Sequence, residues 1–275
     1  DVTFGGGGHS KEILKRLGEN GRLIAFDQDE DAERNAIKDP RFVLVRQNYR
    51  FIKNFLRYYD AIPVDGILAD LGISSYQINE AERGFSIRFE AELDMRMNRE
   101  SKVTAADILN QYSEEKLLKI FSQYGEVHNS KTLAKKIVEV RKETKLTHID
   151  QFKEAIRSIA DKQAESQYYA KVFQALRIEV NEELESLKEM LLETANVLAP
   201  QGRLVVLSYH SLEDRLVKNI IAKGQFEGEV EKDVFGNQKN NPFKAVNRKP
   251  IEATEEEVKR NPRSRSAKLR IAEKN

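Results

Sequence analysis

The sequence predicts an α/β fold in which a doubly wound sheet is interrupted by an all-helical insertion. Short apolar runs alternate with amphipathic helices at both ends of the chain, as expected for parallel strands covered by helices. Between these stretches the strand pattern is absent and only helical periodicity remains. The expected parts are residues 1–98 for the first part of the core, 99–180 for the helical insertion and 181–275 for the second part of the core.

A glycine loop near the start of the chain indicates a ligand site. Residues 1–4 are expected to end a strand, residues 5–8 are all glycine, and residues 11–17 have the apolar spacing of a helix. Glycine adopts positive φ and lets a ligand approach the backbone, while a helix start adds N–H groups and partial positive charge. The next predicted strand, residues 22–26, is followed by Asp27, where an acid is placed to bind ribose hydroxyls. Together these features predict a nucleoside site.

The spacing of the loop favours S-adenosylmethionine over a dinucleotide. The dinucleotide fingerprint G-x-G-x-x-G fails because Ser10 stands where the third glycine is required, and no P-loop pattern is present. Asp1 precedes the glycines by four residues. Methyltransferases of the Rossmann-like class place an acid there, facing the amino-acid end of their cofactor. We therefore expect S-adenosylmethionine as the cofactor, and no metal.

Three further apolar runs extend the predicted sheet. Residues 42–45, 64–69 and 202–207 are expected to be strands, and a long amphipathic helix precedes the last of them. In a doubly wound sheet, ligands bind at the carboxyl ends of the strands. Asp70 and Ser208 directly follow two of these strands. We therefore expect both residues at the binding edge of the sheet.

The inserted segment is predicted to be helical throughout. Thr104 and Ser113 have the N-cap pattern, because acidic residues follow each within the first turn. Lys131, Lys135 and Lys142 point away from the apolar face of their helix, a pattern typical of a solvated surface and also compatible with phosphate contact. Because the segment follows the strand that ends at Asp70, we expect it to recognise the substrate. The expected helices span residues 104–112, 114–124, 131–143, 149–161 and 166–178.

The composition excludes several classes of chemistry. With 40% hydrophobic and 33% charged residues and no stretch long enough to span a bilayer, the chain is expected to be globular, with no membrane partner. It contains no cysteine, which excludes disulfides, cysteine-ligated metals and a thiolate nucleophile, and favours a reducing cytoplasm. The net charge is only +1, but residues 239–270 hold ten Lys or Arg against four Glu. This asymmetry indicates either a polyanionic partner or a solvated tail.

Eight sequence blocks together carry a resemblance to a known family. They keep their order along nearly the whole chain, which makes a chance match very improbable. The blocks are TFGGGGHS at 3–10, DLGISS at 70–75, AERGFS at 81–86, LDMRM at 93–97, FQALR at 173–177, SYHSLEDR at 208–215, NRKP at 247–250 and RSAKLR at 265–270. Through these blocks the chain resembles the bacterial 16S ribosomal RNA cytosine-N4 methyltransferases, which modify a decoding-centre cytidine.

The resemblance implies the residues of the cofactor site and shows some departures. Tyr49 stands where the family usually has Phe, which keeps an aromatic face for adenine. Tyr76 replaces a usual Pro, and Tyr209 a usual Phe. The resemblance also implies that most of the family's first strand, with the helix before it, is missing here. The implied cofactor residues are Gly7, Gly8, His9, Asp27, Tyr49, Asp70 and Gln77.

The residues also constrain the reaction. Methylation of cytosine at carbon 5 normally uses a Cys nucleophile, which this chain lacks, so the acceptor is an exocyclic amine, a ring nitrogen or a hydroxyl. The resemblance selects the N4 amine. Asp70 is the first candidate for a catalytic group, and His210 and Ser211 come next, although His210 is also typical of a structural loop histidine. Many amine methyltransferases carry Asn/Asp-Pro-Pro-aromatic where this chain has DLGI at 70–73.

Four residues are expected to contact RNA. Arg83, Phe85 and Arg96 lie in dense blocks after Asp70, and RNA bases taken out of a stack are held by aromatic and Arg side chains; an ion-paired loop is the alternative. Lys249 lies in the basic NRKP block. The expected partner is small-subunit ribosomal RNA in the assembled subunit, and not DNA. A nicotinamide-dependent oxidoreductase and a non-catalytic ribosome-assembly factor remain as alternative functions.

Overall fold

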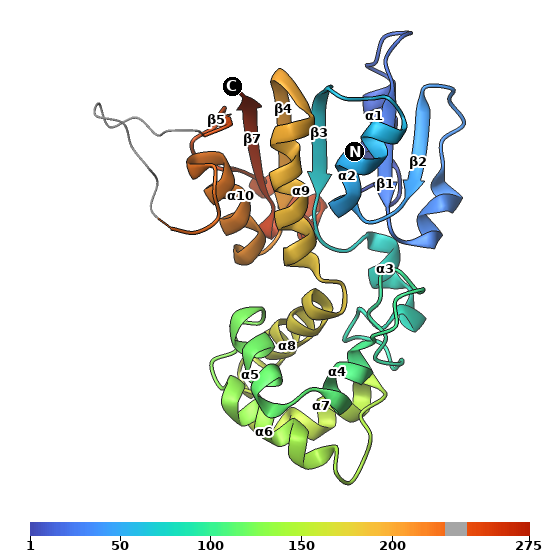
Figure 1. Cartoon of the computed structure of the whole chain (residues 1–275). Helices are drawn as coiled ribbons and strands as arrows, with labels where there is room; N and C mark the ends of the chain where they lie inside the picture. Colours follow the sequence, from blue (N-terminus) through green and yellow to red (C-terminus); the bar gives the residue numbers. More distant parts are fainter. Residues whose placement is uncertain (229–240) are drawn as a thin grey trace. The chain divides into compact units, whose positions relative to one another are not determined.

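The computed structural model describes residues 1–228 and 241–275 and divides into two compact units (Figure 1). The first unit consists of Asp1–Gly72 and Leu184–Asn275, and the second of Ile73–Glu183. The predicted insertion of residues 99–180 lies inside the second unit, which begins earlier because apolar side chains before residue 99 pack into its core. Lys239, counted above in the basic segment, lies outside the described residues.

The first unit is an α/β sheet whose strands and helices alternate along the chain, as predicted. β1 and β2 pair in parallel, with Asp27 opposite Arg46, and β3 and β4 pair in parallel, with Asp70 opposite Leu207. The carboxyl ends of the strands within each pair therefore lie together. The four strands are β1 (Leu23–Asp27), β2 (Phe42–Arg46), β3 (Val64–Asp70) and β4 (Leu198–Ser208).

Residues 1–4 connect the two strand pairs. The Val2 N–H donates to the Leu68 carbonyl of β3 at 2.8 Å, and the Phe26 N–H of β1 donates to the Asp1 carbonyl at 2.9 Å. The expected strand end at residues 1–4 is therefore not a regular strand, because its bonds do not form a regular ladder. The segment nevertheless occupies the position of a strand between β1 and β3. It brings the glycine loop to the same edge of the sheet as Asp27 and Asp70.

The C-terminal part of the chain adds antiparallel strands to this sheet. β7 (Lys268–Lys274) pairs with β4, and β5 (Phe243–Ala245) and β6 (Ile251–Glu252) pair with β7. The basic segment is therefore not simply a solvated tail, since its last part is a strand in which Arg270 is buried. Charged residues alternate with apolar ones in β7 and conceal its apolar period in the sequence.

Helices and short turns of helix cover the first unit. The helix predicted at 11–17 begins earlier, at Gly8, because Gly7 is the N-cap residue with φ 73°. Phe51 directly precedes α2 and is 43% exposed. The elements are α1 (Gly8–Leu14), η1 (Glu30–Asn35), η2 (Tyr49–Phe51), α2 (Ile52–Tyr58), α9 (Glu183–Val197), α10 (Ser211–Lys223), α11 (Glu255–Arg260) and η5 (Pro262–Ser266).

Both faces of the sheet are buried, which establishes the doubly wound arrangement. In β1, Ile24 and Phe26 belong to one apolar cluster together with side chains of α2, α9 and α10. Ala25, which points to the other face, belongs to a second cluster with Phe4 and Ala32. A parallel sheet covered on both faces is the arrangement that the nearly continuous apolar strands predicted.

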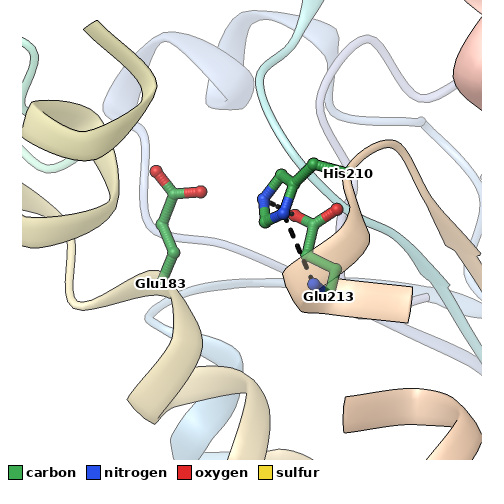
Figure 2. Close-up of side chains that lie close together, drawn as sticks. All are labelled: Glu183, His210 and Glu213. Carbon is green, nitrogen blue, oxygen red and sulfur yellow. Dashed lines mark hydrogen bonds and ion pairs between the residues drawn. The ribbon is translucent and has the colours of Figure 1, made fainter. Parts of the chain in front are cut away.

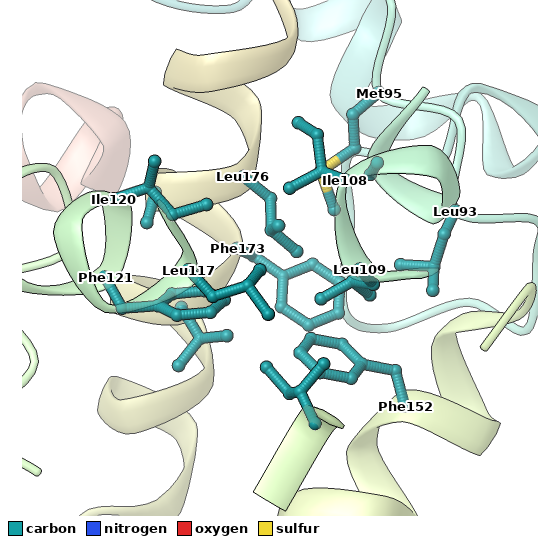
Figure 3. Packing of buried hydrophobic residues seen from close by; sticks show 14 of the residues in the cluster. Leu93, Met95, Ile108, Leu109, Leu117, Ile120, Phe121, Phe152, Phe173 and Leu176 are labelled. Carbon is teal, nitrogen blue, oxygen red and sulfur yellow. The ribbon is translucent and has the colours of Figure 1, made fainter. Parts of the chain in front are cut away.

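The second unit is built mainly from helices around one apolar core (Figure 3). Thr104 and Ser113 cap α4 and α5 through their side chains, as predicted. Phe121, Phe152 and Phe173 fill the centre of the core and are at most 4% exposed. Among the described residues, no helix has the length and apolar character needed to cross a bilayer. The elements are α3 (Ser75–Asn79), η3 (Ala81–Arg83), α4 (Ala105–Gln111), α5 (Glu114–Gln123), α6 (Ser130–Val140), α7 (Ile149–Ile156), η4 (Arg157–Ile159) and α8 (Glu165–Val180).

Candidate active site

The glycine loop is held against the end of β1 by the carboxylate of Asp27. The Gly5 N–H donates to Asp27 Oδ2 at 2.7 Å, and the Asp29 N–H donates to Oδ1 at 2.9 Å. Gly7 has φ +73°, and a Cβ there would lie 2.9 Å from the Phe4 ring, so only glycine fits. The loop with Gly7 and Gly8 and the acid are thus brought together.

Asp1 precedes the same loop, and both oxygens of its carboxylate accept hydrogen bonds from within the protein. Its Oδ2 accepts the Ser10 hydroxyl at 2.7 Å, and its Oδ1 accepts the Thr3 N–H at 3.1 Å. Asp1 is 8% exposed and Ser10 is fully buried. Ser10, the residue that breaks the dinucleotide fingerprint, therefore anchors the acid before the glycines. The Asp1 carboxylate therefore stabilises the loop from the protein interior and does not project into solvent.

Asp70, at the end of β3, meets the start of α1. Its Oδ2 lies 3.7 Å from His9 Nδ1, and its backbone N–H donates to Thr3 Oγ1 at 2.6 Å. The His9 side chain is about half exposed, at 49%, whereas that of Asp70 is 28% exposed. Two of the residues expected at the cofactor site, His9 and Asp70, therefore lie side by side and are both reachable from solvent.

Opposing influences act on the pKa of Asp70. Burial raises it, since the charged carboxylate loses hydration, and the negative charge of Glu213 raises it further. The hydrogen bond from Tyr209 and the positive charge of protonated His9 lower it. The net result is a pKa above the usual range for Asp. Perturbed carboxyl groups of this kind cluster at functional sites, which makes Asp70 the leading candidate here.

Tyr209 completes the surroundings of Asp70. Its hydroxyl donates to Asp70 Oδ1 at 2.7 Å, and its backbone N–H donates to Glu213 Oε2 at 3.0 Å. Burial raises the pKa of the Tyr209 phenol, and the charges of Asp70, Glu213 and Glu257 raise it further. Tyr209 therefore keeps its proton at neutral pH and acts as a hydrogen-bond donor.

His210 serves as the N-cap of α10, where it contacts Glu213 (Figure 2). The Glu213 N–H donates to His210 Nδ1 at 3.4 Å, so Nδ1 is the acceptor and a neutral ring carries its proton on Nε2. Nε2 lies 3.1 Å from Glu213 Oε1, but it is buried and not aligned for a hydrogen bond among the described residues. This geometry supports a structural cap. A proton relay through His210 stays a prediction.

Ser211 and Tyr49 occupy different places in the first unit. Ser211 is the first residue of α10 and is exposed, next to the Tyr209–His210 turn. Tyr49 begins η2, which two residues separate from the end of β2, and packs, half-buried, against the cluster that contains Ile52 and Leu56. Tyr49 follows β2, the strand that pairs with the one ending at Asp27.

Gln77, the remaining residue expected at the cofactor site, belongs to the second unit and caps a helix. Its side-chain oxygen accepts the Ser74 N–H at 3.0 Å, and its own N–H donates to Ser74 Oγ at 3.2 Å. This reciprocal pair is a capping box, and Gln77 is 5% exposed. A cofactor contact of Gln77 stays a prediction.

Three of the residues expected to contact RNA hold the segment before α4 in place. Arg83 is 2% exposed, and its Nη2 donates to the carbonyls of Arg96 and Met97 at 3.0 Å each. Its guanidinium also lies over the ring of Phe85, which is buried in the helical core. Arg96 forms a two-bond ion pair with Asp94. RNA contact by Arg83 or Phe85 would require this segment to rearrange, and it stays a prediction.

Lys249, the fourth expected RNA contact, is exposed in the first unit. It precedes β6, whose Glu252 lies opposite Lys268 at the start of β7. Lys268 in turn lies opposite Ser208, the last residue of β4. Lys249 therefore belongs to the part of the chain that runs along the carboxyl edge of the sheet.

The sequence did not predict the contacts made by Tyr209, Glu213 and Thr3. Tyr209 and Thr3 bind Asp70 through hydrogen bonds between segments far apart in the chain, which no local pattern encodes, whereas Glu213 accepts the Tyr209 N–H from four residues away. One signal was available, because His210 and Glu213 have the spacing of an N-cap residue and its capping-box acid. That spacing could have identified His210 as a helix cap.

Comparison with known proteins decides the family. Residues 1–275, the whole chain, match the family model described as the MraW methylase family. This chain belongs to the MraW methylase family. The protein named Ribosomal RNA small subunit methyltransferase H from Bacteroides fragilis is 58% identical over 274 residues, which cover 100% of this chain and 90% of that protein. Its namesake from Flavobacterium johnsoniae is 53% identical over 274 residues, with the same coverage of both chains.

Membership of the MraW methylase family indicates what the carboxyl edge of the sheet binds. The chain is a methyltransferase with a Rossmann-like fold, and its glycine loop, Asp27 and Asp70 gather where such a sheet binds ligands. Thr3 and Tyr209 both bind Asp70, which the resemblance assigned to the cofactor site.

Proposed function

We propose that this chain transfers a methyl group from S-adenosylmethionine to the exocyclic N4 amine of a decoding-centre cytidine in 16S ribosomal RNA. The observation that carries the proposal is the convergence of the glycine loop, Asp27 and Asp70 in a chain of the MraW methylase family. The names of relatives that are 53% and 58% identical support ribosomal RNA as the substrate. We place the reaction in the cytoplasm, on the assembled small subunit.

The residues at the edge of the sheet suit S-adenosylmethionine. Asp27 would accept the ribose hydroxyls, Tyr49 would offer its ring to adenine, and His9 and Asp70 with the backbone of the glycine loop would hold the amino-acid end. The two carboxylates suit a cofactor with hydroxyl donors and an ammonium group. When bound, S-adenosylmethionine supplies an electrophilic methyl group on a sulfonium, a chemistry that needs no metal.

Asp70 is the group that we propose to act on the acceptor amine. The lone pair of a cytosine amine is delocalised into the ring, and a carboxylate that accepts an amine N–H favours the reactive geometry and stabilises the developing charge. Asp70 is partly exposed, and its ionised form is stabilised by Tyr209 and by protonated His9. Ser211, exposed at the start of α10, is the second polar group offered to the substrate.

The exposed cations of the C-terminal segment are proposed to bind RNA phosphates. α11 and η5 directly precede β7, which begins opposite the end of β4 at Ser208. In contrast, the cavity of about 560 Å³ in the second unit is lined by four carboxylates and a single Arg, an excess of negative charge that does not suit a phosphate. The exposed cations are Lys244, Arg248, Lys249, Lys259, Arg260, Arg263 and Arg265.

The test is methyl transfer by the full-length protein. Small ribosomal subunits lacking the modification are incubated with the protein and isotopically labelled S-adenosylmethionine, and the nucleosides are analysed by mass spectrometry. Label in N4-methylcytidine is the expected result and establishes the cofactor and acceptor atom together. Label in another nucleoside would replace the acceptor, and no label despite measured cofactor binding would favour an assembly factor.

A competition experiment addresses the nicotinamide alternative. Binding of labelled S-adenosylmethionine is measured with increasing NAD. We expect no displacement, because Ser10 occupies the third glycine position of the dinucleotide fingerprint and is fully buried against Asp1. Displacement at micromolar NAD would reverse the assignment of the cofactor.

A further inference from the structure

Tyr209 links two acidic groups at the carboxyl edge, and the proposed reaction does not otherwise use it. Its hydroxyl binds Asp70 Oδ1 at 2.7 Å, and its backbone N–H binds Glu213 Oε2 at 3.0 Å. Asp70 ends β3, and Glu213 lies in the first turn of α10. Tyr209 therefore connects the end of β3 to the start of α10, next to the partly exposed carboxylate of Asp70.

The position of the Tyr209 side chain is fixed from several sides. Ser208 before it is paired with Lys268 in the sheet, and His210 after it caps α10. The chain that leaves Asp70 turns at Gly72, where φ is +97° and a Cβ would lie 3.8 Å from Tyr209 Cδ2. The phenol therefore lies against the backbone that follows Asp70.

Asp70 is held in turn at two points. Its backbone N–H donates to Thr3 Oγ1, and its Oδ1 accepts the Tyr209 hydroxyl. The first contact holds the backbone of Asp70, and the second restrains its carboxylate through Oδ1 and leaves Oδ2, which lies 3.7 Å from His9 Nδ1. We propose that Tyr209 is a positioning residue that holds Asp70 in one orientation, so that Oδ2 is available to the acceptor amine. This inference rests on the proposed function, because it takes Asp70 as the group that acts on the amine.

The charged groups around Asp70 and Tyr209 determine in which direction each variant moves the pKa of Asp70. Asp70 is influenced by Tyr209, by His9 on α1 and by Glu213 on α10, while Glu257 on α11 acts on Tyr209. The Tyr209 hydrogen bond and the His9 charge favour ionised Asp70, whereas burial and Glu213 oppose it. Removing the hydroxyl therefore raises the pKa of Asp70, and removing the Glu213 charge lowers it.

Two variants test the proposal in opposite directions. Tyr209→Phe removes only the hydroxyl and keeps the ring against Gly72. We expect kcat to fall roughly tenfold with little change in the KM for either substrate, since a hydrogen bond to a charged group is lost. Because the pKa of Asp70 rises, the acidic limb of the pH profile of kcat should move to higher pH. Glu213→Gln should move that limb to lower pH. Tyr58→Phe is the matched control, because Tyr58 is 79% exposed on α2, and it should behave like the parent.

A direct titration separates this proposal from the proposed function. With 13C-labelled aspartate, the Asp70 carboxyl signal is assigned by its loss in Asp70→Asn and followed against pH. We expect it to titrate at higher pH in Tyr209→Phe. If Tyr209→Phe lowers the melting temperature but leaves this titration and the pH profile unchanged, Tyr209 only packs and the proposal is overturned. If the parent protein transfers no methyl group, the proposed function fails while the titration still decides whether Tyr209 controls Asp70.

Discussion

The carboxyl edge of the first unit and the segment before α4 in the second unit use charged residues in opposite ways. At the edge, Asp27 and Asp70 accept hydrogen bonds from the surrounding chain and remain partly exposed. In the second unit, Arg83 and Arg96 direct their guanidinium groups to carbonyls and to Asp94. Both regions are dense motif blocks in the sequence. A dense block can therefore mark a structural constraint, as at Arg83, which is 2% exposed, or a group that a ligand can reach, as at Asp70, whose side chain is 28% exposed.

The pair of Asp214 and Arg270 extends this comparison to a structural contact inside the first unit. Arg270 donates two hydrogen bonds to the Asp214 carboxylate, at 2.6 and 3.0 Å, and ties α10 to β7. Both side chains are almost buried, with 12% of Asp214 and 11% of Arg270 exposed. We expect Asp214→Asn to lower the free energy of unfolding by about 3 kcal/mol, because a buried guanidinium loses its counter-charge. Denaturant unfolding measures the effect, with Glu255→Gln on exposed α11 as the control.

The same pair predicts a pH dependence with a definite sign. Burial raises the pKa of Asp214, but the hydrogen bonds and charge of Arg270 and the charge of Lys268 outweigh it and leave the pKa below the usual range. A group with a lowered folded pKa stabilises the protein above its unfolded pKa, about 3.9, and loses that contribution as the pH falls through the folded value. The stability difference between parent and Asp214→Asn should therefore shrink in acid. A constant difference across pH 3 to 7 would contradict this account.

Asp27→Ala tests the binding side of the comparison. We expect the Kd for S-adenosylmethionine to rise about 100-fold, since a charged partner of the ribose hydroxyls and an anchor of the Gly5 N–H are both removed. RNA affinity should stay nearly unchanged. Calorimetric titration and RNA filter binding measure the two, and Asp65→Ala, an exposed carboxylate near the amino end of β3, is the control. Equal loss in both variants would mean a general electrostatic effect rather than a ribose contact.

Most of the sheet could be predicted from the sequence, because its strands are buried and read as continuous apolar runs. The helices of the second unit could also be predicted, since Thr104 and Ser113 provide caps and apolar residues repeat at helical spacing. The strand β7 could not be predicted from the sequence, because its alternating charges resemble a solvated segment and its partner β4 lies far away in the sequence.

The candidate site was predictable in part for the same reason. The glycine loop, Asp27 and Asp70 follow from strand ends, which local patterns reveal. The hydroxyl of Tyr209 on Asp70 joins residues 139 positions apart and leaves no local trace. The burial of Arg83 was equally hidden, because an Arg in a motif block looks the same whether it contacts RNA or backbone carbonyls.

Arg83→Met tests the structural side of the comparison. We expect about 2 kcal/mol of lost stability, because the carbonyls of Arg96 and Met97 lose a charged donor. Thermal unfolding measures it, and Arg88→Met, at an exposed position in the same segment, should change little. Unchanged stability combined with weaker RNA binding would instead identify Arg83 as an RNA contact and remove the distinction drawn between the two regions.

Lys249→Ala tests whether the exposed basic segment completes the binding edge, and it has the smallest expected effect. Lys249 is exposed, so its replacement removes one phosphate contact and leaves no buried group without a partner. We expect RNA affinity to fall only about 2- to 5-fold and the salt dependence of log Kd to decrease by about one counterion, with methyl transfer retained at saturating subunits. Lys38→Ala provides the control, because Lys38 is exposed near the amino end of β2, at the opposite edge of the sheet. If both lysines weaken binding equally, RNA recognition depends on overall charge, and the carboxyl edge has no special role in holding the RNA backbone.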